Sequence, residues 1–248
     1  MIVVGTSGWQ YKDWREAFYP RDVPQKRWLE YFGEHFTTVE SNNAFYRLPE
    51  RKTFVEWRDR TPDDFVVAVK MSRYLTHLKR LKEPEEPVAR FLDRVAGLGD
   101  KLGPVLLQLP PNLRADAVLL AGVLRRIPPR IRVAVEPRHD SWWTNETRRV
   151  LAEHGAALCW ADRGSRPVTP LWRTADFGYV RLHHGRTGPG YGRTALTRWV
   201  ERIAEEYTPS NEVFVYFNND PQAAAPADAA TLARIARRRG VRVSRTPH

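Results

Sequence analysis

Short apolar runs recur along the chain, and most are followed by a stretch with the spacing of an amphipathic helix. The runs begin 22 to 40 residues apart, close to the roughly 30 residues that a strand and its crossover helix need. They are Ile2–Thr6, Thr38–Asn42, Phe65–Lys70, Val105–Leu109, Arg132–Glu136, Ala157–Asp162, Tyr179–His183 and Glu212–Asn218. The helical patterns are Gln25–His35, Glu50–Arg60, Glu86–Leu98, Ala115–Arg126, Glu146–His154, Leu196–Tyr207 and Ala227–Arg239. Capping residues at Thr144–Thr147 mark the start of one of these helices.

This alternation of strands and helices predicts a parallel sheet. Eight units in 248 residues predict an α/β fold with a single (β/α)8 TIM-type barrel domain over residues 1–248. A doubly wound open sheet is the alternative, but no G-x-G-x-x-G motif follows the first run.

Side chains alternate between the two faces of a strand, so each run indicates which residues point into the barrel. In Val133–Glu136 the valines should face the helices, and Ala134 and Glu136 the interior. Nearly every run is apolar up to its C-terminal end, where a polar residue follows, and the alternation predicts that this polar side chain points inward. These residues are Thr6, Glu40, Asn42, Lys70, Gln108, Glu136, Asp162, Arg181, His183, Tyr216 and Asn218. Barrel active sites lie at that end of the strands, so a functional mouth is expected there.

The chain carries 40 basic and 29 acidic side chains, a formal charge of +11, which invites a nucleic-acid interpretation. The charge is uneven: residues 1–124 carry net +2 and residues 125–248 net +9. The expected last helix and tail contribute Arg234, Arg237, Arg238, Arg239, Arg242 and Arg245. We interpret this cluster as a solvated face, with a polyanion contact as the alternative.

Cys159 is the single cysteine, so no intrachain disulfide forms and a reducing, cytoplasmic location is expected. Its position within the sixth run predicts outward parity and a place in the core. The N-terminal Met1–Gly5 lacks a basic leader, and the longest apolar run, Ala117–Leu124, is too short for a membrane span. We expect no membrane partner and a monomer or weak dimer.

The charges predicted for the mouth balance one another, with Glu40, Glu136 and Asp162 opposing Lys70, Arg138 and Arg181. Such opposed groups shift one another's proton affinities, as acid–base catalysis requires. The catalytic candidates are Glu40, Lys70, Glu136, Arg138 and His183. Lys70 is a candidate base, Schiff-base amine or anion contact, and Glu136 a general base held by Arg138. The alternative is a buried ion-pair network that orders the top of the barrel.

Glu40, Glu136, Asp162 and His183 form a mixed oxygen and nitrogen set that could hold one divalent ion. The chain has no H-E-x-x-H motif and no pair of C-x-x-C motifs, and adjacent His183 and His184 should point to opposite faces. We therefore predict no metal and no cofactor. Gly5–Gly8 lacks the G-x-S-x-G spacing of a nucleophile elbow, which makes Ser7 a poor nucleophile candidate.

Two further features suggest ligand contacts. The loop His184–Arg193 holds four glycines with Arg186 and Arg193, and phosphate sites in such barrels often use the loops after strands seven and eight. Trp9 and Tyr11 follow the first run and could stack on a sugar or a base, with helix packing as the alternative. The expected substrate contacts are Thr6, Trp9, Tyr11, Asn42, Gln108, Asp162, Arg181, Arg186, Arg193, Tyr216 and Asn218.

In the segments that carry many of these candidate residues, the chain resembles the YecE-like proteins, the domain-of-unknown-function family numbered seventy-two. The matching segments span almost the whole chain in order. They are Gly5–Trp9, Trp14–Pro20, Val39–Pro49, Val69–Lys70 with Thr76–His77, Leu107–Pro111, Val135–His139, Tyr179–His183 and Phe217–Asp220.

The resemblance implies a TIM-type barrel without an assigned reaction. It also implies a similarity to apurinic-endonuclease-type barrels, which is a fold analogy. The chain departs from the family pattern at Pro137, at His183–Gly185 and after Asp220, where the usual glycine and aromatic are lost. The last departure puts a ligand contact from that loop in question.

Three functions remain open from the sequence. The preferred one is a soluble enzyme, of hydrolase or lyase/isomerase type, that acts on a small anionic or phosphorylated substrate by acid–base chemistry at the mouth. The second is a nucleic-acid-binding or nucleic-acid-processing barrel of endonuclease type, in which DNA or RNA is the partner. The third is a non-catalytic binding protein.

Overall fold

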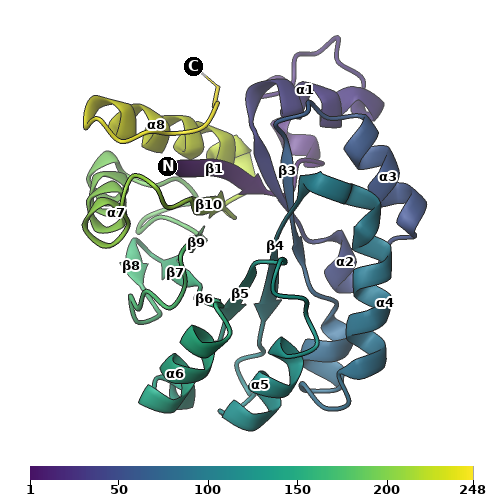
Figure 1. Cartoon of the computed structure of the whole chain (residues 1–248). Helices are drawn as coiled ribbons and strands as arrows, with labels where there is room; N and C mark the ends of the chain where they lie inside the picture. The colour runs from purple at the N-terminus through teal and green to yellow at the C-terminus, as the bar shows by residue number, and fades with distance from the viewer. Residues whose placement is uncertain (248) are drawn as a thin grey trace.

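A curled, mainly parallel sheet of ten strands forms the centre of the computed structural model, which describes residues 1–247 (Figure 1). Its strand order is β6-β5-β4-β3-β2-β1-β10-β9-β7-β8, and every pair is parallel except β7 with β8. The strands are β1 Ile2–Ser7, β2 Thr38–Ser41, β3 Val66–Lys70, β4 Leu102–Gln108, β5 Val133–Glu136, β6 Ala157–Leu158, β7 Trp160–Arg163, β8 Arg166–Pro167, β9 Gly178–Leu182 and β10 Val213–Phe217.

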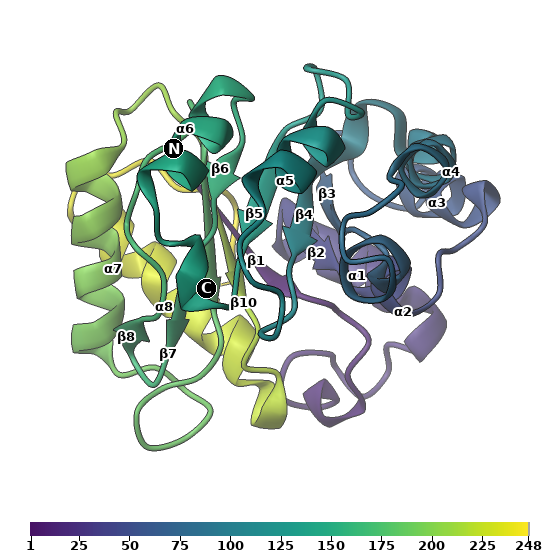
Figure 2. The same cartoon turned by 90° about the horizontal axis from the view of Figure 1, so that it is seen from below.

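Helices lie around the outside of this sheet, with α7 and α8 on one side and α1, α3 and α4 on the other (Figure 2). The α-helices are α1 Trp28–His35, α2 Asn43–Tyr46, α3 Arg51–Asp59, α4 Glu85–Val95, α5 Ala117–Leu124, α6 Asn145–Glu153, α7 Arg193–Glu206 and α8 Ala224–Arg238. Short 3-10 turns lie at η1 Lys12–Trp14, η2 Gln25–Arg27, η4 Ala96–Lys101, η5 Asp140–Trp142 and η6 Pro221–Ala223, and η3 Tyr74–Leu78 is a π-helical turn.

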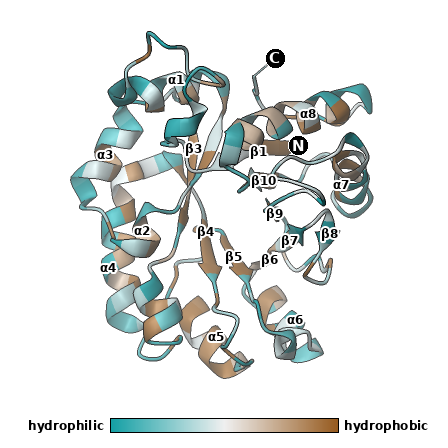
Figure 3. Ribbon diagram, turned by 180° about the vertical axis from the view of Figure 1, so that it is seen from behind, coloured by the Kyte–Doolittle hydropathy of each residue, from teal (hydrophilic) through white to brown (hydrophobic). Residues whose placement is uncertain are grey.

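Each of the eight predicted runs overlaps a strand, and each of the seven helical patterns overlaps a helix. The predicted cap is confirmed, because the Thr144 hydroxyl accepts a hydrogen bond from the backbone N–H of Thr147 at 3.1 Å. Strands β4 and β5 and helix α5 are among the most hydrophobic parts of the chain in Figure 3, as expected for strands covered on both faces.

The sixth unit departs from the predicted regular barrel. Its run forms two strands, β6 paired with β5 and β7 paired with β9, with Cys159 between them. The chain then turns through Gly164 and Ser165, both with positive φ, into the antiparallel strand β8, and no helix forms before β9. The hydroxyls of Thr169 and Thr174 accept hydrogen bonds from the backbone of β7 and β6, so the coil covers these strands in place of a helix.

The sheet separates two apolar clusters. The larger one lies between the strands and the helices, and the smaller one fills the inside of the curl with Val3, Ala68, Leu106, Ala134, Ala157, Cys159, Phe177, Tyr179, Phe214 and Tyr216. Cys159 therefore faces inward, and its predicted outward parity is wrong. No helix within residues 1–247 is long and apolar enough to cross a membrane. The predicted single domain over residues 1–248 stays a prediction, and its last residue, His248, lies outside the described residues.

Candidate functional site

A cavity of about 540 Å³ opens at the C-terminal ends of the strands. Asn42, Lys70, Gln108 and Arg181 reach it from the ends of β2, β3, β4 and β9. The complete lining is Tyr11, Asn42, Phe45, Tyr46, Lys70, Arg73, His77, Gln108, Arg138, Arg181, Asn218 and Asp220. This is the edge at which barrel enzymes carry their active sites.

A buried ion network forms the floor of the cavity, with Arg181 between two carboxylates. Arg181 donates to both oxygens of Glu40 (2.9 and 2.8 Å) and to Oε2 of Glu136 (2.6 Å), and all three side chains are buried. The hydroxyls of Ser7 and Tyr179 also donate to Glu40. Burial alone would raise the pKa of Glu40, but the charge and hydrogen bonds of Arg181 outweigh it, so that the pKa is lowered.

Glu136 accepts two further hydrogen bonds, one at each carboxylate oxygen. Arg138 Nε donates to Oε1 at 2.9 Å, and Gln108 Nε2 donates to Oε2 at 3.1 Å. Burial opposes ionisation, but Arg181 and Arg138 hold the pKa of Glu136 well below its ordinary value. Glu40 and Glu136 are therefore ionised and fully engaged, which makes both of them weak bases.

Lys70 lies beside this network without joining it. Its side chain is 7% exposed and packs over the Phe45 ring, with Nζ 3.8 Å from the ring centroid. No hydrogen bond or ion pair within residues 1–247 involves its ammonium group. Burial, together with the nearby Arg181 charge, lowers the pKa of Lys70 to about 8. The cavity thus contains a poorly solvated cation without an anionic partner.

The His183 ring is neutral and oriented. Asn218 Nδ2 donates to Nδ1 at 2.9 Å, so the ring hydrogen is on Nε2. This Nε2 is buried, lies 3.9 Å from Glu136 Oε1, and has no hydrogen-bond partner in the described chain. Burial and the Arg181 charge lower the pKa of His183 to about 3. The ring is therefore a hydrogen-bond donor and not a cation.

Two predicted inward residues point the other way. Thr6 lies on the helix side of β1 and donates to Gly8 O at 2.6 Å, while its neighbour Ser7 bonds Glu40 and Asn42 inside the curl. Asp162 accepts from Trp199 Nε1 (2.9 Å) and from the Tyr191 hydroxyl (2.7 Å), both outside the sheet. Both predicted orientations are wrong. A shift of one residue turns every side chain of a strand to the other face, and the sequence at these two strand ends does not distinguish the two possibilities.

The remaining predicted contacts are dispersed. Tyr216 points inward but lies deeper, where its hydroxyl bonds Thr38 at 2.7 Å. Trp9 is buried against Trp57 with ring centroids 5.1 Å apart, away from the cavity lining. Arg193 lines a separate cavity of about 120 Å³ with residues of α8, and Arg186 is exposed outside the mouth lining.

Five residues of the lining were not predicted from the sequence: Phe45, Tyr46, Arg73, His77 and Asp220. Phe45, His77 and Asp220 lie in segments that carry the family resemblance, so these segments were the available signal. Arg163 was not predicted either, because the predicted register of β7 was wrong by one residue and put Asp162 on the inner face in its place. Arg163 ends β7 on the inner side and lines a neighbouring cavity of about 250 Å³ with Glu136 and Arg138.

The four candidate metal ligands are not brought together. Asp162 faces outward, and both carboxylates of the floor are occupied by arginines. Among residues 1–247 no group of three or more His, Cys, Asp or Glu side chains has the arrangement of a metal site.

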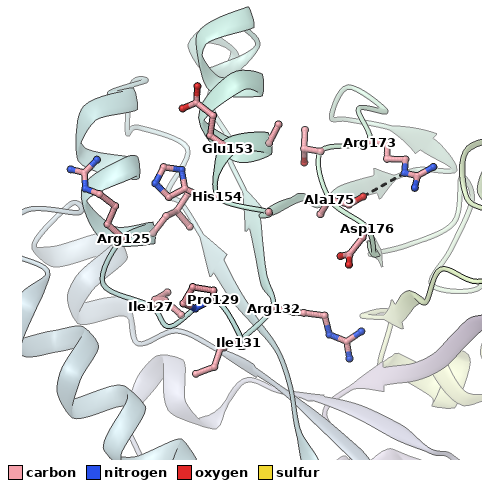
Figure 4. Close-up of a pocket in the computed structure, with 14 residues that line it drawn as sticks. Arg125, Ile127, Pro129, Ile131, Arg132, Glu153, His154, Arg173, Ala175 and Asp176 are labelled. Carbon is pink, nitrogen blue, oxygen red and sulfur yellow. Dashed lines mark hydrogen bonds between the residues drawn. The ribbon is translucent and has the colours of Figure 1, made fainter.

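A larger cavity, of about 1060 Å³, opens at the opposite edge of the sheet, before β5, β6 and β9. Figure 4 shows its walls, with His154 and Arg125 across from Arg173 and Asp176. Its residues come from the loops that precede the strands, the end at which barrels carry stability and not chemistry. We therefore place the candidate site at the Lys70 cavity.

Four of the six C-terminal arginines contact other parts of the chain. Arg245 forms a two-point ion pair with Asp64 at 3.0 Å, Arg239 pairs with Glu201 at 2.9 Å, and Arg237 and Arg242 donate to backbone carbonyls. The predicted solvated face of arginines therefore also forms hydrogen bonds and ion pairs within the chain.

Comparisons with known proteins give a consistent picture. A family model described as "Protein of unknown function DUF72" matches residues 3–248. Two Escherichia coli relatives, each described as UPF0759 protein YecE, are 28% identical to the chain. The first match covers 68% of this chain but only 61% of the relative, and the second covers 62% and 55%.

Solved structures extend the comparison. A DUF72 family protein from Thermotoga maritima superimposes with a TM-score of 0.82 at 26% identity, covering 96% of this chain and 99% of that one. One from Enterococcus faecalis gives 0.80 at 19% identity, covering 100% and 99%. A more distant likeness in fold is 3-keto-D-glucoside 4-epimerase, YcjR, from Escherichia coli, with a TM-score of 0.54 at 15% identity, covering 96% and 100%.

Proposed function

The chain belongs to the DUF72 family, and from this premise we propose that it is an enzyme acting on a small anionic or phosphorylated substrate. The substrate binds in the Lys70 cavity, and the reaction proceeds by acid–base chemistry. We also propose that the curled sheet works as a closed (β/α)8-type barrel, because β6 and β7 continue one another across Cys159 and pair with β5 and β9.

The observation that carries the proposal is the unpaired ammonium group of Lys70. A buried charge without a partner is costly, and an anion that enters the cavity removes this cost. Arg73 and Arg138 line the same cavity and add positive charge, while Asn42, Gln108 and Asn218 offer neutral hydrogen bonds. A volume of about 540 Å³ accommodates a small metabolite.

The proposal gives different roles to the charged residues of the mouth. Lys70 contacts the oxygen of the substrate that gains negative charge. Glu40, Glu136 and Arg181 form a rigid electrostatic frame, which Arg138 completes by pairing with Glu136. Arg138 is fixed by Glu136 through Nε, which leaves its terminal nitrogens directed toward a ligand.

A ligand screen by thermal shift tests the proposal, using inorganic phosphate, sugar phosphates, nucleotides and sugar acids. We expect hits whose stabilisation is lost in Lys70→Met and kept in Lys52→Met, an exposed lysine on α3. A hit that stabilises Lys70→Met as much as the wild type would count against the site, as would no hit among these anions. Turnover of a hit, lost in Lys70→Met, separates an enzyme from a non-catalytic binding protein.

Tyr46 favours a second candidate function, because it lines the mouth while 73% exposed and offers a stacking surface for a base. A nucleic-acid partner would span more charges than the cavity holds. Its affinity should therefore fall by orders of magnitude between about 50 and 200 mM salt if several phosphates are contacted. A small anion bound to Lys70 should show a much shallower dependence.

A further inference from the structure

Asp220 enters the cavity from the loop after β10, and its carboxyl group lacks a cation. Its Oδ1 is buried and has no hydrogen-bond partner in residues 1–247, although the side chain lines the cavity. Glu40 and Glu136, in contrast, each bond to an arginine. Asp220 is therefore the one carboxyl group of the cavity lining that is free to exchange a proton.

The Tyr11 hydroxyl lies beside this carboxyl group and can serve it in either protonation state. It donates to Ser7 O at 2.6 Å and is also within reach of Asp220. A phenol has one hydrogen, so it either donates to Ser7 and accepts from protonated Asp220, or turns and donates to ionised Asp220. Tyr11 thus accommodates both states without a rearrangement of the backbone.

The backbone around Asp220 is held in a costly conformation. Trp14 Nε1 donates to Asp220 O at 2.9 Å, and Asp13 accepts from the backbone N–H of Gln222 at 2.9 Å. Gln222 and Ala223 both have left-handed φ, at 60° and 54°, which residues with a Cβ rarely adopt. Strain of this kind concentrates at functional sites, and here the hydrogen bonds from Trp14 and to Asp13 hold the loop in this conformation.

We propose that Asp220 is the residue that takes and returns a proton on the substrate, and that the substrate is a small carbonyl compound carrying an anionic group. This inference rests on the proposed function of the Lys70 cavity. The carbonyl oxygen and the anionic group both face Lys70, and Arg73 and Arg138 also bind the anionic group.

The reaction then needs no further reagent. The Asp220 carboxylate removes a proton from the carbon next to the carbonyl, and the electron pair of that C–H bond moves to the carbonyl oxygen. The Lys70 ammonium group stabilises the resulting enolate. The Asp220 carboxylic acid returns the proton to carbon and becomes a carboxylate again. Return of the proton to the same face of that carbon only exchanges its hydrogen, whereas return to the opposite face inverts the carbon. The composition of the substrate is unchanged in both cases.

The electrostatics of the loop agree with this role. Burial raises the pKa of Asp220 to about 7, assisted by the charges of Asp13 and Glu40 and opposed by Tyr11 and Arg181. A base with a pKa near the working pH is the efficient choice. Since Lys70 has a pKa of about 8, the rate should rise as Asp220 ionises and fall as Lys70 loses its proton.

The test uses dihydroxyacetone phosphate as a probe in D₂O, with exchange of its carbon-bound hydrogens followed by NMR. We expect wild-type protein to catalyse the exchange, and Asp220→Asn to slow it at least about 100-fold while the affinity for inorganic phosphate changes little. Asp100→Asn, an exposed aspartate, should behave as wild type. Tyr11→Phe should move the acidic limb of the pH profile to higher pH, because Tyr11 lowers the pKa of Asp220.

The outcomes separate the two proposals. Absence of binding of both phosphate and the probe to the wild-type protein overturns the proposed function and this inference with it. Binding that depends on Lys70, together with exchange that is absent or unchanged in Asp220→Asn, overturns the role of Asp220 alone.

Discussion

Arg181 and Glu40 form a two-point ion pair across the floor of the cavity, with Nε and Nη2 of the arginine 2.9 and 2.8 Å from the two carboxylate oxygens. The third guanidinium nitrogen reaches Glu136, 2.6 Å away. One buried cation thus bridges two buried carboxylates that come from β2 and β5, and Arg138 supplies the second positive charge by pairing with Glu136. The network joins distant strands and sets the electrostatic background against which Lys70 and Asp220 act.

Arg181→Met should therefore be strongly destabilising. Removing one partner of a buried ion pair costs about 3–5 kcal/mol, because the remaining charges stay desolvated. Urea unfolding monitored by tryptophan fluorescence measures the change at pH 7. Arg149→Met, which removes a pair between exposed residues, is the control and should cost less than about 1 kcal/mol. A loss at Arg181 no larger than this control would mean that the network does not stabilise the fold.

Arg181→Met should also reverse the way in which the free energy of unfolding depends on pH. In the wild type the pKa values of Glu40 and Glu136 lie below the ordinary value of 4.5, so their stabilisation is present above that pH and is lost on acidification. In Arg181→Met burial raises the pKa of Glu40, which loses its ion pair, whereas Arg138 still pairs with Glu136. Stability should then increase as the pH falls toward 5. Unfolding curves between pH 5 and 8 test the sign, and parallel profiles for the two proteins would contradict it.

The order of strands and helices follows from the sequence because hydrophobic periodicity reports burial directly. The positions of Lys70, Glu136 and Arg181 at the mouth follow as well, because the alternation along β3, β5 and β9 puts each of them on the inner face near the end of its strand. Thr6 and Asp162 could not be placed in this way. Their strands carry apolar or small side chains on both faces, so periodicity leaves two registers of equal quality.

Asp220 could not be predicted for a different reason. It lies in a loop, where no periodicity applies, and its burial depends on contacts with Tyr11, Asp13 and Trp14, more than 200 residues earlier in the chain. The split of the sixth run also depends on tertiary contacts, because Thr169 and Thr174 bond the strand backbone only after the coil has folded back.

Lys70→Met should stabilise the protein in a pH-dependent manner. The folded-state pKa of about 8 lies below the ordinary value of 10.5, so below pH 8 the folded protein retains a charge that the unfolded chain solvates better. The substitution should add up to about 3 kcal/mol at pH 7 and under about 1 kcal/mol at pH 10. Urea unfolding at both pH values measures this, with Lys52→Met as the control. Equal gains at the two pH values would contradict the lowered pKa.

The C-terminal tail should contribute to stability through Ser244. Its hydroxyl accepts a hydrogen bond from the backbone N–H of Val4 at 3.0 Å, and its own N–H donates to Ile2 O at 2.9 Å. Ser244→Ala leaves the N–H of Val4 buried without an acceptor, which should cost about 1–3 kcal/mol. Thermal unfolding checks the loss, and Ser210→Ala in an exposed turn should change stability little. Similar melting temperatures for the two variants would show that the Ser244 hydroxyl does not stabilise the protein.

The glycine-rich loop provides a matched pair of substitutions that distinguishes folding from ligand binding. A Cβ at Gly185 would lie 1.9 Å from the backbone oxygen of Gly190, whereas one at Gly188 would meet nothing within 4 Å. Gly185→Ala should therefore force the loop open, disturb the Tyr191 hydroxyl that bonds Asp162, and destabilise the protein by about 1–3 kcal/mol. Gly188→Ala should be nearly neutral.

Since the loop contacts α8 and not the mouth lining, ligands of the Lys70 cavity should bind both variants as they bind the wild type. Weaker ligand binding in Gly188→Ala at unchanged stability would instead indicate that the loop reaches the substrate.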